Sequence, residues 1–139
     1  MAENMNKVEN AISNANAHCK DIAEFWKEYH NAEDKGEDTD DIVQDILDSP
    51  LSVEVRSDWH TPGDEVFSKP AEYRILLTWG GPGLRITGYL NQNQQADNAC
   101  LEVKEWFTKW TKVDEKTKGM TDYNKEQLLW FAEFFYFGE

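Results

Sequence analysis

Cysteine and long apolar runs are scarce in this sequence, and each shortage excludes a class of protein. Cys19 and Cys100 are its two cysteines among 139 residues, in unrelated surroundings, so a disulfide framework is not expected. No stretch approaches the roughly 20 consecutive apolar residues of a membrane span, and the first residues lack the apolar centre of a signal peptide. The sequence therefore predicts a cytoplasmic protein that makes no contact with a membrane.

Positive charge is also in short supply. Fourteen Lys and Arg stand against 27 Asp and Glu, which gives a net charge of -13 and an isoelectric point near 4.6. Direct binding of nucleic acid needs clustered Lys and Arg to neutralise phosphates, so it is not expected here. Anionic membrane surfaces are disfavoured for the same reason.

Apolar residues, by contrast, are plentiful enough for a folded core. Hydrophobic residues make up 40% of the chain and aromatic residues 13%, whereas disordered chains are poor in both. The length suits a single domain over residues 1–139. Within it we expect an acidic helical part at 1–49, and a sheet followed by a C-terminal helix at 50–139.

Two helices are predicted before residue 50. An apolar stripe recurs at spacings of three and four over the first thirty residues: Met5, Val8, Ile12, Ala15, Cys19, Ile22, Trp26 and Tyr29. Gly36 supplies a stop. A second helix is expected from Asp40 to Asp48, capped by Asp38 or Thr39. The long stripe either packs on the protein's own sheet, which we favour, or forms a coiled-coil dimer.

The middle of the chain alternates with a period of two, as strands do. Four antiparallel strands in meander order are expected, with Val53, Val55 and Trp59 on the buried side of the first, and a bulge near Glu105 in the last. The opposite face would carry charged residues able to form cross-strand ion pairs: Glu54, Arg56, Glu72, Arg74, Arg85, Glu102 and Lys104. Residues 109–118 are expected to form a loop.

A last, strongly apolar helix begins near Asn124, where Asn124 and Gln127 suit a capping box. With this helix packed on the sheet, the fold class is α+β: two N-terminal helices, a four-stranded antiparallel meander and one C-terminal helix.

Acidic residues are concentrated around the second helix. Eight carboxylates and one lysine lie between residues 33 and 48, and the carboxylates are Glu33, Asp34, Glu37, Asp38, Asp40, Asp41, Asp45 and Asp48. Asp21, Glu24 and Glu28 form a second stripe on the first helix. Such a face either solubilises the protein or binds a basic partner by imitating the regular charge of a nucleic-acid backbone. The residues alone favour solubilisation.

Motifs for catalysis, metal binding or cofactor binding are weak. The histidines and cysteines show no zinc-ligand spacing, so no metal site is expected. His60, with Asp58 and Asp64 nearby, is the best candidate for a general base in a small hydrolase, a reading we do not favour. The run from Gly80 to Gly83 lacks the Lys-Ser/Thr of a phosphate-binding loop. No enzyme activity and no cofactor are expected.

Two blocks of sequence resemble a group of small phage and prophage proteins of unassigned function. The first block has Trp79-Gly80-Gly81-Pro82, then Arg85, Gly88, Leu90, Leu101, Trp106 and Trp110. The second block is the C-terminal segment with Leu128-Leu129-Trp130-Phe131 and Phe135-Tyr136-Phe137-Gly138-Glu139. The resemblance covers roughly residues 72–139. Glu105-Trp106-Phe107-Thr108-Lys109-Trp110 departs from the Asp-Trp-x-Thr-Pro-Trp of such proteins, and no catalytic residue carries over.

The resemblance implies a context in which small acidic proteins bind and block host proteins. It raises the partner-binding interpretation of the acidic residues. We therefore expect an inhibitor, monomeric or homodimeric, that acts in the cytosol of a bacterial host. Its partner would be a basic nucleic-acid-binding defence complex of the CRISPR or restriction type. The alternative is a phage structural, assembly or dimeric adaptor protein that binds through its apolar helices.

Overall fold

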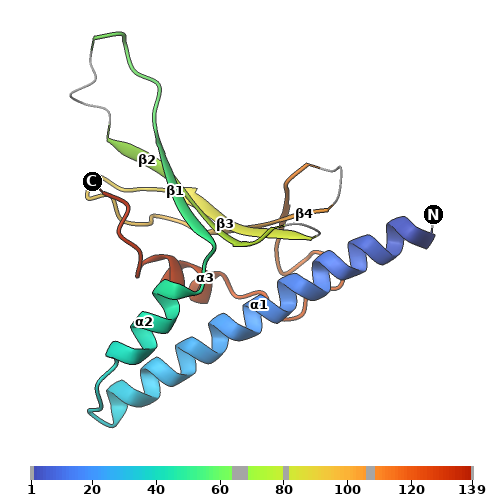
Figure 1. Ribbon diagram of the computed structural model, residues 1–139, viewed down its shortest axis with the longest axis horizontal. Coiled ribbons are helices and arrows are strands. Elements are labelled where there is room, and N and C mark those ends of the chain that lie inside the picture. Colours follow the sequence, from blue (N-terminus) through green and yellow to red (C-terminus); the bar gives the residue numbers. More distant parts are fainter. Residues whose placement is uncertain (1, 64–68, 80–81, 106–108, 139) are drawn as a thin grey trace.

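The structure, a computed structural model, has the α+β fold expected from the sequence, with helices on one face of an antiparallel sheet (Figure 1). It describes residues 2–63, 69–79, 82–105 and 109–138, of which 2–9 are described by their backbone alone. The elements in chain order are α1 (Ala2–Asp34), α2 (Asp40–Asp48), β1 (Ser52–Ser57), β2 (Pro70–Thr78), β3 (Gly83–Tyr89), β4 (Cys100–Lys104), β5 (Thr111–Val113) and α3 (Lys125–Ala132).

The sheet is an antiparallel meander with strand order β1-β2-β3-β4-β5. Alternation along the strands sends one set of side chains to the helices and the other to the outer face. The set facing the helices is buried: Tyr73, Ile75, Leu77, Leu84, Ile86, Leu101, Val103 and Val113. These residues are the sheet's contribution to the hydrophobic core.

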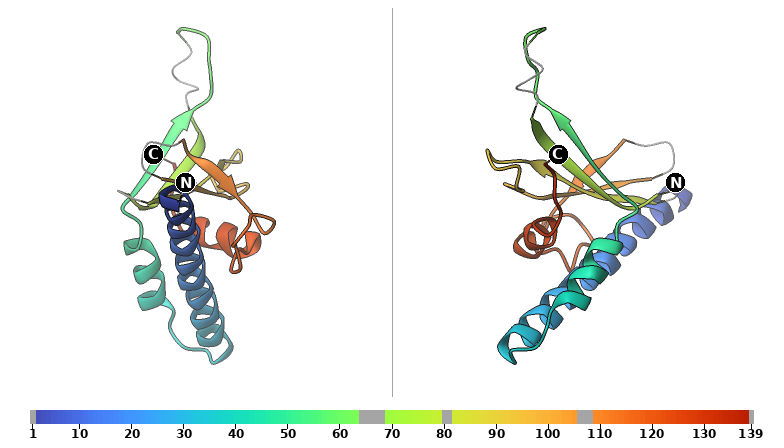
Figure 2. Two further views of the ribbon diagram at one scale, coloured as in Figure 1. Left: turned by 90° about the vertical axis from the view of Figure 1, so that its right-hand side faces the viewer. Right: turned by 60° about the vertical axis from the view of Figure 1, so that its left-hand side comes forward.

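The apolar stripe of α1 forms much of the helical layer that packs on these strands. Ile12, Ala15, Cys19 and Ile22 are buried in the core together with residues of the sheet. Figure 2 shows α1 crossing below the sheet, with α2 on one side of it and α3 on the other. The stripe therefore packs inside its own chain, as favoured over a coiled coil. Met5 and Val8 lie outside the described side chains.

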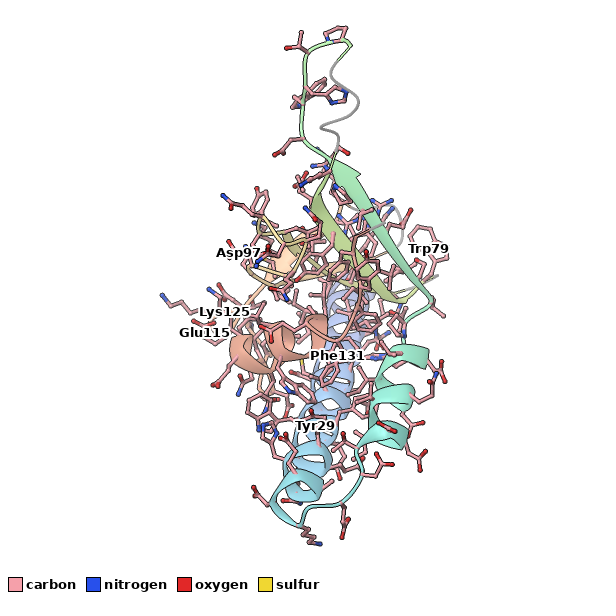
Figure 3. All side chains as sticks on the ribbon, turned by 90° about the vertical axis from the view of Figure 1, so that its left-hand side faces the viewer. Tyr29, Trp79, Asp97, Glu115, Lys125 and Phe131 are labelled. Carbon is pink, nitrogen blue, oxygen red and sulfur yellow. The ribbon has the colours of Figure 1, made fainter. Side chains whose placement is uncertain are left out.

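The C-terminal helix closes the core. The side chain of Asn124 accepts a hydrogen bond from the backbone N–H of Gln127 at 3.0 Å, which confirms the predicted cap. Phe131 is buried between α3 and α1 (Figure 3) and stacks on Phe25 with ring centres 6.4 Å apart. After the helix, Phe137 covers Tyr73, whose ring centre is 4.6 Å away.

Two predictions about the sheet were wrong. The segment 109–118 contains a fifth strand, β5, whose Val113 pairs with Leu101 and is buried. Val53 and Val55 are 39% and 40% exposed, and Trp59 lies beyond the end of β1, fully in solvent. Their burial would require a helix to extend over β1, and the helices contact β3 and β4 instead.

The end of the fourth strand also differs in extent. β4 stops at Lys104, so the bulge predicted near Glu105 adjoins residues 106–108, which lie outside the described residues.

One side chain of α1 fastens a distant part of the chain. The amide of Asn16 donates to the carbonyl of Gly119 at 2.8 Å. Its carbonyl oxygen accepts from the backbone N–H groups of Thr121 at 3.0 Å and Asp122 at 3.1 Å. The loop leading into α3 is thereby held against the helix that begins the fold.

Candidate acidic interface

A tight helix end creates the acidic tip of the molecule. Gly36, at φ 67°, adopts the left-handed conformation that glycine tolerates best. The N–H of Glu37 donates to the carbonyl of Ala32 at 2.8 Å, and the N–H of Gly36 donates to that of Glu33 at 3.0 Å. This pattern of hydrogen bonds ends α1 and reverses the chain. As a result α2 runs back beside α1, and the acidic turn lies far from the sheet (Figure 1).

The amphipathic pattern of α2 determines which of its residues face solvent. Ile46 is completely buried and Ile42 packs against the core. Asp41 and Asp45, on the opposite side, are exposed. Burial of the apolar side therefore fixes the acidic side outward.

All eight carboxylates singled out in the sequence are exposed, and we call this set the acidic interface: Glu33, Asp34, Glu37, Asp38, Asp40, Asp41, Asp45 and Asp48. Asp38 accepts the N–H of Asp40 at 2.9 Å, and Asp48 accepts the amide of Gln44 at 3.0 Å. The three ion pairs of the described residues all lie on the sheet. The charge of the acidic interface is therefore left without a basic partner in that part of the chain.

The second acidic stripe borders a cavity that the sequence did not reveal. Asp21, Glu24 and Glu28 line a hollow of about 310 Å³ between α1, the end of α2 and the core. Its apolar wall consists of Ile22, Phe25, Leu77 and Phe131. An apolar wall beside carboxylates suits the aliphatic stem and charged head of a lysine or arginine. Only the tertiary packing brings the wall together, so no local pattern could have indicated it.

The outer face of the sheet is neutralised internally, in contrast to the acidic interface. Arg74 donates to Glu54 at 2.8 Å and lowers the pKa of that carboxyl, chiefly through the hydrogen bond. Arg56 donates to Glu72 across the same two strands, and Arg85 pairs with Glu102 across β3 and β4. The prediction of cross-strand ion pairs is therefore confirmed.

Two tryptophans extend this face beyond what the sequence suggested. Arg85 donates to Glu102 at 2.7 Å and lies over the ring of Trp110, 4.1 Å from its centre. The ammonium of Lys104 lies 5.3 Å from the ring centre of Trp79. Trp79 itself remains 64% exposed (Figure 3). The alternation of β3 and β4 indicated the positions of the two cations, but nothing local indicated the aromatic partners.

In the part of the chain that the structure describes, His60 contacts the backbone of its own loop. The ring Nδ1 lies 3.3 Å from the backbone carbonyl of Asp58, and the histidine is exposed. Asp64 and the glycines at 80–81 lie outside the described residues. Across the described ranges, no group of three or more His, Cys, Asp and Glu side chains is arranged to hold a metal ion.

The thiol of Cys19 is a packing group. It is 3% exposed on the α1 stripe. Burial, with a smaller effect from Asp122, raises its pKa to about 11. Because the thiolate is the reactive form, this cysteine is a poor nucleophile.

None of the described helices has the length and apolarity needed to cross a membrane. Comparison with protein-family models, with curated proteins and with solved structures gave no match to this chain.

Proposed function

We propose that this protein is a non-enzymatic inhibitor that binds a basic nucleic-acid-binding protein through the acidic interface. The observation that carries the proposal is the exposure of all eight carboxylates without a basic partner among the described residues. Like charges held this close repel one another and cost a few tenths of a kcal/mol per pair. A groove lined with Lys and Arg would relieve that repulsion.

The spacing of the charges supports imitation of a phosphate backbone. Asp41, Asp45 and Asp48 follow one another along α2 at intervals of three or four residues, which places successive charges roughly 5 Å apart along the helix axis. Asp38, expected on the same helix, lies just before it. One DNA strand carries a phosphate every ~3.4 Å along the axis of the duplex. The two spacings are of the same order, and the helical pair projects from the sheet, so a concave site could receive it (Figure 2).

The class of partner follows from the resemblance to small phage and prophage proteins. Such a protein would act in the cytosol of a bacterial host, and the host complexes that use basic grooves against phage DNA are CRISPR effectors and restriction enzymes. The proposed mechanism is competition: the carboxylates occupy the groove and exclude the nucleic acid. Charge complementarity would speed association and make it sensitive to salt.

The test measures displacement of labelled DNA from a panel of purified CRISPR effector complexes and restriction enzymes. We expect the protein to displace DNA from at least one of them, less effectively as salt rises. A variant with Asp38, Asp41, Asp45 and Asp48 all changed to Asn should lose about tenfold or more in potency. Asparagine keeps the shape and the capping ability of residue 38, so the fold should survive.

The control variant changes the same amount of net charge elsewhere. Asp97→Asn combined with Glu115→Gln, Glu126→Gln and Glu133→Gln removes four exposed carboxylates outside the acidic interface. It should inhibit nearly as well as the wild type. Displacement from no member of the panel, or equal potency of the two variants, would contradict the proposal.

The alternative, an assembly or adaptor protein that binds through apolar helices, has less support. The aromatic residues that such a contact would use pack against one another inside the chain. Trp26 and Tyr29 of α1 each lie with ring centres within 6 Å of Trp130 on α3. The exposed apolar residues lie mainly elsewhere, at the edge of the sheet.

A further inference from the structure

The outer edge of β1 is open. β1 is the first strand of the meander, and within the described ranges no other strand pairs with its far side. An open edge presents backbone N–H and C=O groups that can pair with another strand. Natural proteins protect such edges with proline, charged side chains or a bulge. β1 contains neither proline nor lysine, and its two charged residues, Glu54 and Arg56, are paired with residues of β2. Its one irregularity lies at its end, between Arg56 and Ser57.

Exposed apolar side chains are concentrated in and around this edge strand, from the end of α2 to the residues after β1. Eight large apolar residues are exposed in the described part of the chain, and five of them lie between residues 47 and 59. They are Leu47 (40% exposed), Leu51 (63%), Val53 (39%), Val55 (40%) and Trp59 (102%). The main contacts between helices and strands are with β3 and β4. Apolar side chains gathered beside an open strand edge indicate an interaction surface.

We propose that β1 pairs with β1 of a second copy of this chain, antiparallel, so that Val55 faces Val55 of the second copy. A two-fold axis then passes through this position, and the interface is self-complementary. On the outer face, Glu54 faces Arg56 of the second copy, and the reverse pair forms on the other side of the axis. If the pairing continues past β1, Leu51 faces Trp59 of the second copy.

The charges on β1 and β2 select this register. Arg74 already pairs with Glu54, and Arg56 with Glu72, across the β1–β2 boundary. The proposed pairing adds Arg56 of the second copy beside Glu54. The sign of the charge then alternates along a row across four strands: Arg74, Glu54, and then Arg56 and Glu72 of the second copy. Opposite charges facing each other across strands are stabilising and like charges are destabilising.

Neighbouring registers lack this complementarity. Side chains alternate between the two faces of a strand. The apolar faces of the two copies therefore lie on the same side of the joined sheet only if the register shifts by two residues at a time. Sliding one way places Glu54 opposite Glu54 of the second copy. Sliding the other way places Arg56 opposite Arg56 of the second copy. Among these three registers, only the proposed one faces opposite charges.

The first experiment measures the mass of the full chain in solution by analytical ultracentrifugation over concentrations up to about 1 mM. We expect a reversible monomer–dimer equilibrium. Val55→Lys places two ammonium groups opposite each other at the axis and should abolish the dimer. Thr111→Lys, on the opposite edge strand β5, should leave it unchanged. A wild type that stays monomeric throughout, or a Val55→Lys variant that still dimerises, would overturn the proposal.

A charge exchange then tests the register without relying on a single variant. Arg56→Glu alone sets Glu54 against a glutamate, and Glu54→Arg alone sets Arg56 against an arginine, so each variant should be monomeric. Mixed in equal amounts, they offer opposite charges at both positions and should form a dimer. Both residues are exposed, so each variant should fold. Circular dichroism checks this. A mixture that remains monomeric, or a single variant that dimerises as the wild type does, would contradict the register.

Discussion

At the scale of single residues, burial converts Cys19 into a pH-sensitive contributor to stability. Its thiol pKa is raised from 9.0 to about 11, chiefly by burial. In the unfolded chain the thiol ionises above its ordinary pKa, whereas in the folded protein it stays protonated until about pH 11. Ionisation therefore lowers the free energy of the unfolded state as pH rises, and stability that is fully present below pH 9 is lost between pH 9 and 11.

We expect the free energy of unfolding to fall by about 2 kcal/mol between pH 8 and pH 10.5 because of this residue, at about 1.4 kcal/mol per unit of pKa. Urea denaturation at the two pH values measures the fall. Cys19→Ala is the control: it loses packing at both pH values, but it has no thiol to ionise. The difference in stability between wild type and variant should shrink at pH 10.5. An unchanged difference would show that the thiol pKa is not raised.

At the scale of elements, the cap of α3 is open to a direct test. Asn124 satisfies the N–H of Gln127 at a helix end that otherwise leaves such groups unpaired. Asn124→Ala should lower the free energy of unfolding by about 1 kcal/mol, and Asn124→Ser, which can still cap, by much less. Thermal or urea denaturation measures both. Equal losses in the two variants would mean that the hydrogen bond does not stabilise the helix.

The elements that could be predicted from sequence are those whose signal is local. The stripe of α1, the apolar side of α2, the cap of α3 and the alternation of β2 and β3 each lie within one segment, and each prediction is confirmed. The cap predicted for α2 is not confirmed at Thr39, which stands at the N-cap without a side-chain cap hydrogen bond. β5 escaped prediction because three residues are too short to show a period, and its pairing with β4 is a tertiary event. The burial of Val53 and Val55 was mispredicted for a related reason: alternation says which side chains share a face but not whether a helix covers it.

The candidate site also has one feature that could be predicted from the sequence and one that could not. Exposure of the carboxylates on α2 followed from the amphipathic pattern of that helix and could be predicted. The cavity beside Asp21 and Glu24 could not, because Leu77 and Phe131 reach it from other parts of the chain.

At the scale of the whole molecule, the net charge of -13 means that repulsion between carboxylates lowers the stability of the folded state. Salt screens exposed charges over about 10 Å at 0.1 M. We therefore expect the melting temperature to rise by a few degrees between about 20 mM and 0.5 M NaCl. The variant with Asn at positions 38, 41, 45 and 48 should melt slightly higher than the wild type in low salt and gain less from added salt.

Differential scanning calorimetry of the two proteins at both salt concentrations provides the measurement. The control variant at residues 97, 115, 126 and 133 removes the same net charge from scattered positions. It should gain less stability in low salt than the variant in the acidic interface, because the eight carboxylates of the acidic interface lie close together in the sequence and the four control positions do not. A melting temperature that falls with salt would show that favourable ion pairs outweigh the repulsion.

The hydrogen bonds of Asn16 have a consequence for the timing of folding during translation. Its partners begin 103 residues further along the chain, and a ribosome adds about 5–20 residues each second. The first helix therefore waits roughly 5–20 s for these partners after it has been made. Throughout that interval Ile12, Ala15 and Ile22 lack part of the layer that later buries them. We therefore expect the nascent chain to expose apolar surface that chaperones can bind until the loop before α3 has been made and α1 packs in the core.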